Sequence, residues 1–519
     1  MDAIKILWAD DEIDLLKPQL LFLEKKGYEV VTVTNGHDAL EVFAESTDID
    51  VIFLDESMPG ITGLETLARI KELNANVPVV MITKNEAETV MEDAIGSQIH
   101  DYLIKPVNPN QILMTLKKII DNTRLVQEKT ASAYQQDFRN IFMEINSGLD
   151  LEQWVNVYKK IIGWEIKIDD SNTESMSEIL ATQKNEANAE FSKFVMRNYM
   201  DWIAEDSGAP VLSHQVMQRF VFPKLKEKKP VIMLVLDNLR FDQWKIIEKT
   251  LIGDFRVESE DYFMSILPTA TQYSRNAIFA GMMPGDIAKH YPEYWRNDNE
   301  EGGKNLYEEQ LLFKQIDRVV KDEIRAKYIK VTNFAKAQQL EDNILNCLNN
   351  DLTVIVYNFI DMMSHARTEM EVLKELAKDE KAYRSLTNSW FLNSPLWSGL
   401  QRLAEKDVTL VVTTDHGTIR VRQPSKVIGD RETTTNLRYK MGRNLRYEKN
   451  DVLEVRDPER AGLPKVNMSS SYIFAIEDVY FLYPNNYSHY NNYFRDTFQH
   501  GGISMQEMIC PVSVLSSKG

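Results

Sequence analysis

Polar side chains end four short apolar runs in the first quarter of the chain, and this pattern restricts the fold more than any other feature. Residues 4–9 and 51–54 run into carboxylates, residues 79–82 into a hydroxyl and residues 102–104 into an amine. The five side chains are Asp10, Asp11, Asp55, Thr83 and Lys105. Alternation of such runs with amphipathic stretches predicts an α/β fold with a parallel sheet. The carboxyl ends of the strands would then meet at one crevice.

Clustered carboxylates at that crevice suit a hard cation such as Mg²⁺. We expect Asp10, Asp11 and Asp55 to hold the ion. The ion, the Thr83 hydroxyl and the Lys105 ammonium could together neutralise a phosphoryl group during its transfer to Asp55. The first domain is therefore predicted to be a phosphorylation switch.

Composition restricts the protein class. The 519 residues suffice for roughly three or four domains. A formal net charge of −18 repels duplex DNA and anionic lipid. Only two cysteines occur, far apart, which indicates a reducing compartment. No signal peptide is visible and no apolar run reaches the ~20 residues of a membrane span. We expect a cytoplasmic protein that neither binds duplex DNA nor inserts into a membrane.

The chain divides into three predicted domains, residues 1–121, 122–222 and 223–519. The middle region shows helical apolar spacing and predicts a helical bundle or arm that acts as a spacer or dimerisation surface. The last region restarts an α/β pattern and predicts one large domain. Specific expectations are helices at 38–45, 63–73, 317–326 and 396–405, strands at 231–236, 353–359 and 408–413, and a kink at Pro18.

A second set of candidate ligands follows the strands of the large domain. Asp361 and His365 are four residues apart, so one helical turn would point both the same way. A mixture of imidazole and carboxylate suits zinc better than magnesium. Six candidates exceed one zinc site, so we expect a metal pair, which can clamp both oxygens of a phosphoryl displacement. The six are Asp237, Asp361, His365, Asp415, His416 and His500.

A nucleophile is available in the run Pro-Thr-Ala-Thr-Gln-Tyr-Ser-Arg at residues 268–275. Thr269, Thr271 and Ser274 each offer a hydroxyl near a predicted loop-to-helix junction, and the residues alone leave the choice open. A helix N-terminus would stabilise an anionic intermediate, and a metal would lower the pKa of the hydroxyl. Arg275 could hold the non-bridging phosphate oxygens.

In their order along the chain, these residues resemble the metal site of the alkaline phosphatase superfamily, specifically the PglZ domain, over residues 230–515. The resemblance implies an alkaline-phosphatase-like α/β domain and favours Thr271 as the nucleophile. It also implies two zinc sites, one made by Asp237, Thr271, Asp415 and His416 and the other by Asp361, His365 and His500.

Together with the first domain, the chain resembles the PorX-type response regulators, which carry a PglZ effector in place of a DNA-binding one. Met58-Pro59-Gly60 after the acceptor also matches the receiver pattern. The resemblance implies a flavodoxin-like receiver, phosphorylation of Asp55 by a membrane histidine kinase, and control of type IX secretion. It further implies a homodimer on phosphorylation. A sigma factor is a further candidate partner.

One basic segment bears on the substrate. Residues 420–449 hold nine basic side chains against three acids: Arg420, Arg422, Lys426, Arg431, Arg438, Lys440, Arg443, Arg446 and Lys449 against Asp430, Glu432 and Glu448. The segment follows Asp415 and His416, so we hypothesise that it holds the flanking phosphates of a short or cyclic oligonucleotide. A solvated loop that pairs with the acidic first or second domain is nearly as well supported.

The sequence thus predicts a response regulator whose phosphorylation at Asp55 controls a two-zinc phosphodiesterase. Thr271 would form a phospho-threonyl intermediate, which water at the second zinc group hydrolyses. Two alternatives stay open: a non-catalytic scaffold that binds a sigma factor or kinase, and a phosphomonoesterase or mutase. A conventional transcription factor is disfavoured by the charge and by the lack of a helix-turn-helix pattern.

Overall fold

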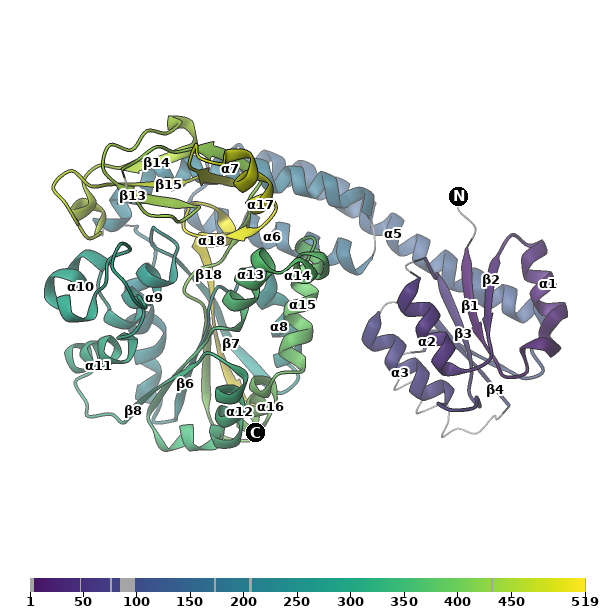
Figure 1. The fold of residues 1–519 in the computed structure, drawn as a ribbon. Helices are drawn as coiled ribbons and strands as arrows, with labels where there is room; N and C mark the ends of the chain where they lie inside the picture. Colours follow the sequence, from purple (N-terminus) through teal and green to yellow (C-terminus); the bar gives the residue numbers. More distant parts are fainter. Residues whose placement is uncertain are drawn as a thin grey trace. The chain divides into compact units, whose positions relative to one another are not determined.

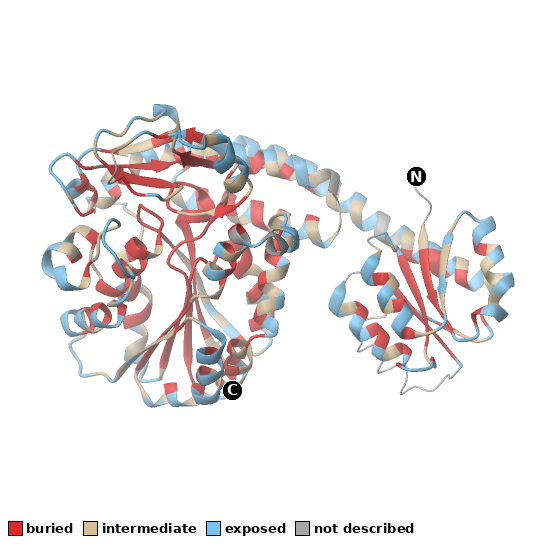
Figure 2. Cartoon of the chain, viewed as in Figure 1, coloured by how far each residue is buried: buried red, intermediate tan, exposed pale blue. Residues whose placement is uncertain are grey.

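The computed structural model describes residues 4–46, 48–74, 77–84, 99–171, 174–204, 208–430 and 433–518 (Figure 1). The chain forms two compact units. The first comprises residues 1–137 and 167–177, and the second comprises residues 138–166 and 178–519. Each unit has buried strands with exposed helical faces around them (Figure 2). No helix of the described residues is both long and apolar enough to cross a membrane.

The first unit contains a five-stranded parallel sheet in the order β2-β1-β3-β4-β5. Its strands are β1 (Lys5–Ala9), β2 (Glu29–Val33), β3 (Val51–Asp55), β4 (Val79–Thr83) and β5 (Asp101–Ile104). This is the strand order of the predicted flavodoxin-like fold. It brings the carboxyl ends of β1 and β3 together where the strand order reverses.

Successive side chains of β1 are buried on opposite faces of this sheet. Ile6 and Trp8 share a core with residues of α1 and α5, whereas Leu7 and Ala9 share one with residues of α2 and α3. Burial on both faces explains the continuous apolar runs in the sequence. The helices are α1 (Lys17–Lys25), preceded by a 3₁₀ turn (Ile13–Leu16), α2 (Gly36–Glu45), α3 (Gly63–Leu73) and α5 (Pro109–Ile145).

The predicted helical middle region is confirmed. Its long helices are α5, α6 (Leu151–Asp170) and α7 (Glu174–Ile203), and the ranges of the two units divide all three. Short 3₁₀ and π turns (Ser213–Gln215, Met217–Val221 and Phe222–Glu227) follow α7 and lead to the large sheet.

The second unit is built on a six-stranded sheet in the order β7-β18-β10-β6-β9-β8. Strands β10, β6, β9 and β8 are parallel, and β18 runs antiparallel between β10 and β7. The strands are β6 (Val231–Leu236), β7 (Phe255–Met264), β8 (Ala326–Val331), β9 (Leu352–Tyr357), β10 (Thr409–Thr413) and β18 (Ile509–Ser517). The strands predicted at 231–236 and 408–413 are confirmed, and the strand predicted at 353–359 is confirmed as far as Tyr357, because Phe359 begins helix α13.

A large apolar core lies between one face of this sheet and five helices. These are α8 (Phe241–Leu251), α12 (Phe334–Asn343), α13 (Phe359–Glu369), α15 (Glu380–Leu392) and α16 (Pro395–Ala404). The other helices of this unit are α9 (Thr271–Ala280), α10 (Pro284–His290), α11 (Glu308–Val319), α14 (Glu371–Leu376), α17 (Tyr487–Phe494) and α18 (Met505–Met508), with short 3₁₀ turns between elements.

Small sheets complete the second unit. Strands β13 (Tyr439–Gly442), β15 (Ser471–Ala475) and β14 (Val452–Val455) form an antiparallel sheet. Two further pairs join β12 (Gln423–Lys426) to β16 (Val479–Leu482) and β11 (Ile419–Arg420) to β17 (Phe498–Gln499). These pairings connect the segment after β10 to the chain that precedes β18.

Two local predictions are wrong. Pro18 lies in the first turn of α1, where its missing N–H removes no helical hydrogen bond, so no kink is needed. The helix predicted at 317–326 does not form: α11 ends at Val319 and β8 begins at Ala326. Pairing of β8 with β9 overrides the helical preference of the charged residues. The helices predicted at 38–45, 63–73 and 396–405 are confirmed by α2, α3 and α16.

Candidate functional site

The first unit brings its strand-end residues into one cluster. Nζ of Lys105 lies 2.9 Å from Oδ2 of Asp10 and 3.1 Å from Oδ1 of Asp55. One carboxylate oxygen from each of Asp10, Asp11 and Asp55 lies within 4.8 Å of the others, a spacing that one cation could occupy. Asp10 and Asp55 are buried and Asp11 is exposed, so the cluster opens to solvent on one side.

Burial, together with the charges of Asp10 and Asp11, raises the pKa of Asp55 to about 6, although Lys105 opposes the rise. A cation here would compensate this excess of negative charge. The Thr83 hydroxyl donates a hydrogen bond to the carboxylate of Glu56, the residue after the predicted acceptor. Sequence reasoning did not identify Glu56, since an acid after a strand end is common.

In the second unit, the sheet order brings Asp237, Asp415 and His416 together. Asp237 follows β6, and the other two follow β10, its neighbour, with Val235 of β6 paired to Thr413 of β10. The three side chains are fully buried, and one ligand atom from each lies within 4.8 Å of the others. This set matches three of the four residues predicted for the first zinc site.

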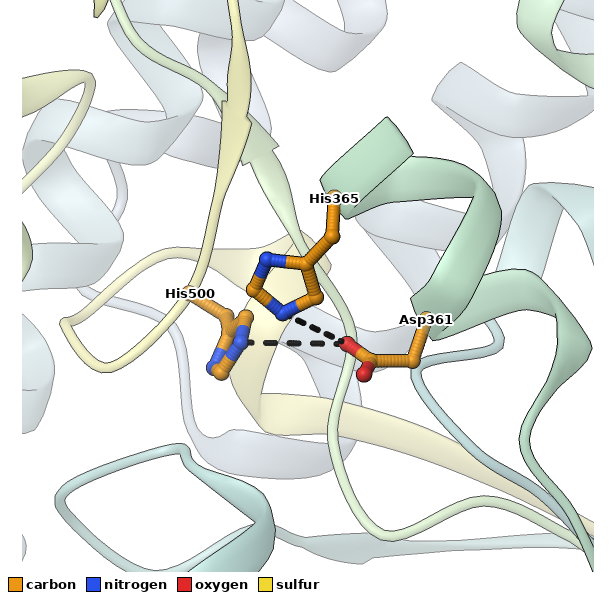
Figure 3. Close-up of side chains that lie close together, drawn as sticks. All are labelled: Asp361, His365 and His500. Carbon is orange, nitrogen blue, oxygen red and sulfur yellow. Dashed lines mark ion pairs between the residues drawn. The ribbon is translucent and has the colours of Figure 1, made fainter. Parts of the chain in front are cut away.

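The second predicted group forms beside the first. Asp361 and His365 come from one face of α13, and His500 follows β17 (Figure 3). Oδ1 of Asp361 lies 3.5 Å from Nε2 of His365 and 4.0 Å from Nε2 of His500. The His365 side chain is 64% exposed, so this group is the one that solvent reaches.

Contacts across the two groups hold them side by side. The rings of His416 and His500 stack with centroids 4.3 Å apart. Asn238 bridges the groups, because its backbone N–H donates to Oδ1 of Asp415 at 3.2 Å and its Nδ2 donates to Oδ1 of Asp361 at 3.4 Å. Asn238 adopts a left-handed backbone with φ of 64°, a conformation that asparagine tolerates better than most residues. The sequence did not distinguish this bridge from an ordinary strand end.

The buried His416 and the partly exposed His500 both present Nε2 to the site. Nδ1 of His416 lies 3.1 Å from the carbonyl oxygen of Gly417, and Nδ1 of His500 lies 3.1 Å from that of Thr269. A proton on Nδ1 satisfies each carbonyl and leaves the Nε2 lone pair free to bind a metal. Burial lowers the pKa of His416 to about 4 and that of His500 to about 3, so both rings are neutral at physiological pH.

The donor atoms fit metal cations. In the described part of the chain, Oδ1 of Asp237 and Oδ2 of Asp415 are buried and accept no hydrogen bond. Burial raises the pKa of both carboxyls, and burial together with these two acids raises that of Asp361. Buried acceptors without donors are costly unless a cation fills the gap. Three carboxylates and three imidazoles form a nitrogen and oxygen set that suits zinc.

Of the three candidate hydroxyls, Thr271 is the one beside these groups. It is the first residue of α9, is partly exposed, and its Oγ1 lies 3.1 Å from Nε2 of His416. Thr269 is buried, where its hydroxyl bonds to the backbone of Gly501 and Gly502. Ser274 is buried against Ser265 at 2.5 Å.

Arg275 contacts carboxylates. Its buried guanidinium reaches Oδ2 of Asp237 with Nη1 and Oε1 of Glu308 with Nε, both at 2.5 Å, and lies 3.6 Å from Oδ2 of Asp415. Glu308 is itself buried and also receives Nζ of Lys330 at 2.7 Å. These contacts suit a residue that orients the ligand carboxylates. The sequence did not indicate Glu308, which lies 33 residues from its partner.

The basic segment is largely engaged within its own unit. Arg420 and Arg422 lie 3.1 Å and 3.6 Å from Asp496, Arg438 is buried 2.7 Å from Glu507, and Arg443 lies 3.0 Å from Asp430. Arg431 and Glu432 lie outside the described residues. The charge of this segment therefore lends little support to phosphate binding.

Three family models match the chain. A model of the BREX system PglZ alkaline phosphatase-like domain matches residues 216–515. A model of the PorX response regulator linker domain matches residues 124–203, and a model of the response regulator receiver domain matches residues 6–117.

Curated relatives share part of the chain. A probable transcriptional regulator, ycf27 of Cyanidium caldarium, is 31% identical over 156 residues, which is 30% of this chain and 59% of that protein. The response regulator SaeR of Staphylococcus epidermidis is 29% identical over 117 residues, or 22% of this chain and 49% of SaeR. The chain thus spans less than two thirds of the length of these relatives.

Similar solved structures are also receiver proteins. Chemotaxis response regulator CheY4 of Vibrio cholerae is 29% identical and covers 22% of this chain and 98% of its own, with a TM-score of 0.22. A response regulator receiver domain protein from Clostridium thermocellum is 29% identical, with 24% and 98% coverage and a TM-score of 0.23.

Proposed function

Because the chain belongs to the PorX-type response regulators, which join a receiver domain to a PglZ alkaline phosphatase-like domain, we propose that it is a phosphorylation-controlled, zinc-dependent phosphodiesterase. Short or cyclic oligonucleotides are the proposed substrates. Thr271 is the proposed nucleophile and Asp55 the proposed phosphoryl acceptor.

One observation carries the catalytic part of the proposal. The partly exposed Thr271 hydroxyl lies 3.1 Å from His416, beside two adjacent groups of acids and imidazoles. The groups would hold one zinc each, on Asp237, Asp415 and His416 and on Asp361, His365 and His500. When bound, zinc would lower the pKa of the hydroxyl and neutralise phosphate charge.

The residues of the chain then perform a two-step displacement. Thr271 releases its hydroxyl proton to solvent and Oγ1 attacks phosphorus; the bond between phosphorus and one ester oxygen of the substrate breaks, and the departing alkoxide takes a proton from solvent. The N–H groups of Thr271 and Gln272 begin α9, before the first helical hydrogen bonds that Tyr273 and Ser274 donate to Ala270, so they can donate to phosphoryl oxygens at this point. Water entering beside the solvent-exposed His365 then cleaves the phospho-threonyl ester and restores the hydroxyl.

The receiver supplies the control. A histidine kinase in the membrane is the proposed phosphodonor for Asp55, and a phosphoryl group there would compete with Glu56 for the Thr83 hydroxyl. Dimerisation of phosphorylated chains and control of type IX secretion are proposed from the family resemblance. A sigma factor is a further proposed partner.

The test compares wild-type protein with Thr271→Val after loading with zinc. Metal content is measured in both, and hydrolysis is followed on a phosphodiester, methyl 4-nitrophenyl phosphate, and a monoester, 4-nitrophenyl phosphate. The proposal predicts diester turnover in wild type and at least a hundredfold loss in the variant, with zinc content unchanged. Turnover of the monoester alone would favour a phosphomonoesterase. Turnover of neither substrate by zinc-loaded wild type would favour a non-catalytic scaffold.

A further inference from the structure

Three partly exposed tyrosines form a stack in the segment between α10 and α11. The ring of Tyr294 lies between its neighbours, 6.1 Å from Tyr291 at an interplanar angle of 24° and 5.5 Å from Tyr307 at 34°. The guanidinium of Arg296 lies 5.8 Å from the centroid of the Tyr307 ring. We call Tyr291, Tyr294, Tyr307 and Arg296 the tyrosine ladder.

Two hydrogen bonds attach the segment that carries the ladder to the proposed nucleophile and to the residue after it. Gln272, the residue after Thr271, donates from Nε2 to the carbonyl oxygen of Arg296 at 2.7 Å. Asn305, two residues before Tyr307, donates from Nδ2 to the carbonyl oxygen of Thr271 itself at 3.0 Å. These two bonds fix the ladder next to the residue that would receive the phosphoryl group.

Side chains other than the ladder rings also hold the segment in place. Trp295 is buried and meets the ring of Tyr273 edge-on at 5.6 Å. The hydroxyl of Tyr273 also donates to Oδ2 of Asp298 at 2.7 Å. Side chains next to the ladder thus anchor the segment to α9, while the ladder rings keep part of their surface in contact with solvent.

We propose that the tyrosine ladder is a nucleobase-binding subsite for the nucleoside next to the scissile phosphate. Among the described residues, the ring contact of Tyr291 is with Tyr294 alone, so a base can stack on Tyr291 at the end of the ladder. An aromatic ring binds any base through its π face, so such a site tolerates sequence variation. Arg296 adds a planar cation that can stack on a base or pair with a neighbouring phosphate. The inference rests on the proposed phosphodiesterase function and identifies the part of the substrate that this site recognises.

The experiment compares two esters with the same leaving group, thymidine 5′-(4-nitrophenyl phosphate) and methyl 4-nitrophenyl phosphate. Removing the end ring in Tyr291→Leu, or the ring that supports it in Tyr294→Leu, should lower kcat/KM for the thymidine ester by about 5- to 100-fold, and that for the methyl ester by less than about twofold. Tyr291→Phe and Tyr294→Phe keep the ring and should stay within about twofold of wild type on both esters.

Tyr490 on α17 supplies the matched control, because it is 41% exposed and stacks on Phe494 at 6.1 Å and 15°. Tyr490→Leu should leave both esters unaffected. Equal losses on the two esters in the ladder variants, or no loss on either, would overturn the proposal.

If wild type hydrolyses neither ester, the proposed catalytic function fails, and binding still tests the ladder. A dinucleotide containing 2-aminopurine should lose fluorescence when its base stacks in the zinc-loaded wild type. The two leucine variants should weaken this binding about 5- to 100-fold. Equal binding by wild type and both variants would overturn the subsite.

Discussion

Glu308 accepts a 2.5 Å hydrogen bond from Nε of Arg275, whose Nη1 reaches Asp237. The carboxylate thereby sets the position of the guanidinium, and the guanidinium sets that of a proposed zinc ligand. Partners behind metal ligands typically contribute 10- to 100-fold to metal affinity. We therefore propose that Glu308 affects the proposed zinc site through Arg275, without contacting the metal itself.

Glu308→Gln should therefore weaken zinc binding at the Asp237 group by about tenfold, measured by competition with a chromophoric chelator. Glu165→Gln is the control, because it breaks a comparable ion pair with Lys184 at 2.8 Å that shares no residue with the ligand groups. Unchanged zinc affinity in a folded Glu308→Gln protein would show that this carboxylate does not position the ligand.

A glycine follows Asp415 and His416 because the structure leaves no space for a side chain at position 417. A Cβ at this position would lie 2.0 Å from the backbone oxygen of Gln506 and 3.4 Å from Cγ of Arg240. Gly417→Ala should displace the loop that carries His416, lower stability by roughly 1–3 kcal/mol and reduce zinc binding. Gly163→Ala is the control, because a Cβ there meets nothing within 4 Å. Thermal unfolding with and without zinc measures both, and equal melting temperatures for the two variants would refute this account of the loop.

The pKa of Asp55 predicts how Mg²⁺ binding depends on pH. Burial raises this pKa to about 6, so the metal-free carboxyl gains a proton as the pH falls through that value. Mg²⁺ needs the carboxylate, hence its affinity should fall by up to about tenfold per pH unit below pH 6. Because the native state binds this proton more tightly, the stability contributed by Asp55 falls as pH rises from about 4 to 6. Calorimetric titration with Mg²⁺ should show the affinity change in wild type and not in Asp55→Asn.

We expect a second pH effect, on the stability of the folded protein, from the buried side chain of Lys440. It is buried on β13 with Nζ 4.5 Å from the centroid of the Tyr483 ring, and burial lowers its pKa to about 7. The unfolded chain holds this proton more tightly, so the stability that depends on Lys440 rises as pH increases from about 7 to 10. Lys440→Met should stabilise the protein by roughly 2 kcal/mol at pH 6.5 and by less at pH 9.5.

Urea unfolding at both pH values measures this difference. The exposed Lys449 provides the control in Lys449→Met, which should change stability little at either pH. A gain in Lys440→Met that is the same at pH 6.5 and 9.5 would contradict a depressed lysine pKa.

Strand-end residues could be predicted because a buried strand leaves a strong local pattern. Asp55 is the last residue of an apolar strand, and Asp237 directly follows another. Each apolar run therefore predicts that its aspartate lies at the carboxyl end of a strand. The spacing of Asp361, His365 and His500 does not by itself predict that they form one metal site. That prediction came from the resemblance to a known family.

Contacts between distant segments could not be predicted in this way. Nothing near Arg275 in the sequence indicates Glu308, and nothing near Arg438 indicates Glu507, 69 residues later. Residues 420–449 do carry more basic than acidic side chains. Arg420 and Arg438 nevertheless pair with Asp496 and Glu507, which lie outside this segment and compensate their charge. The strand at 326–331 was missed for a related reason, since its pairing partner β9 lies farther along the chain.

The most direct test of the account is diffraction from zinc-loaded crystals of the full chain at wavelengths on both sides of the zinc absorption edge. Two anomalous peaks should appear in the second unit, one among Asp237, Asp415 and His416 and one among Asp361, His365 and His500, with Thr271 beside them. Absence of anomalous density at both groups, with zinc bound elsewhere or not at all, would contradict the proposed chemistry.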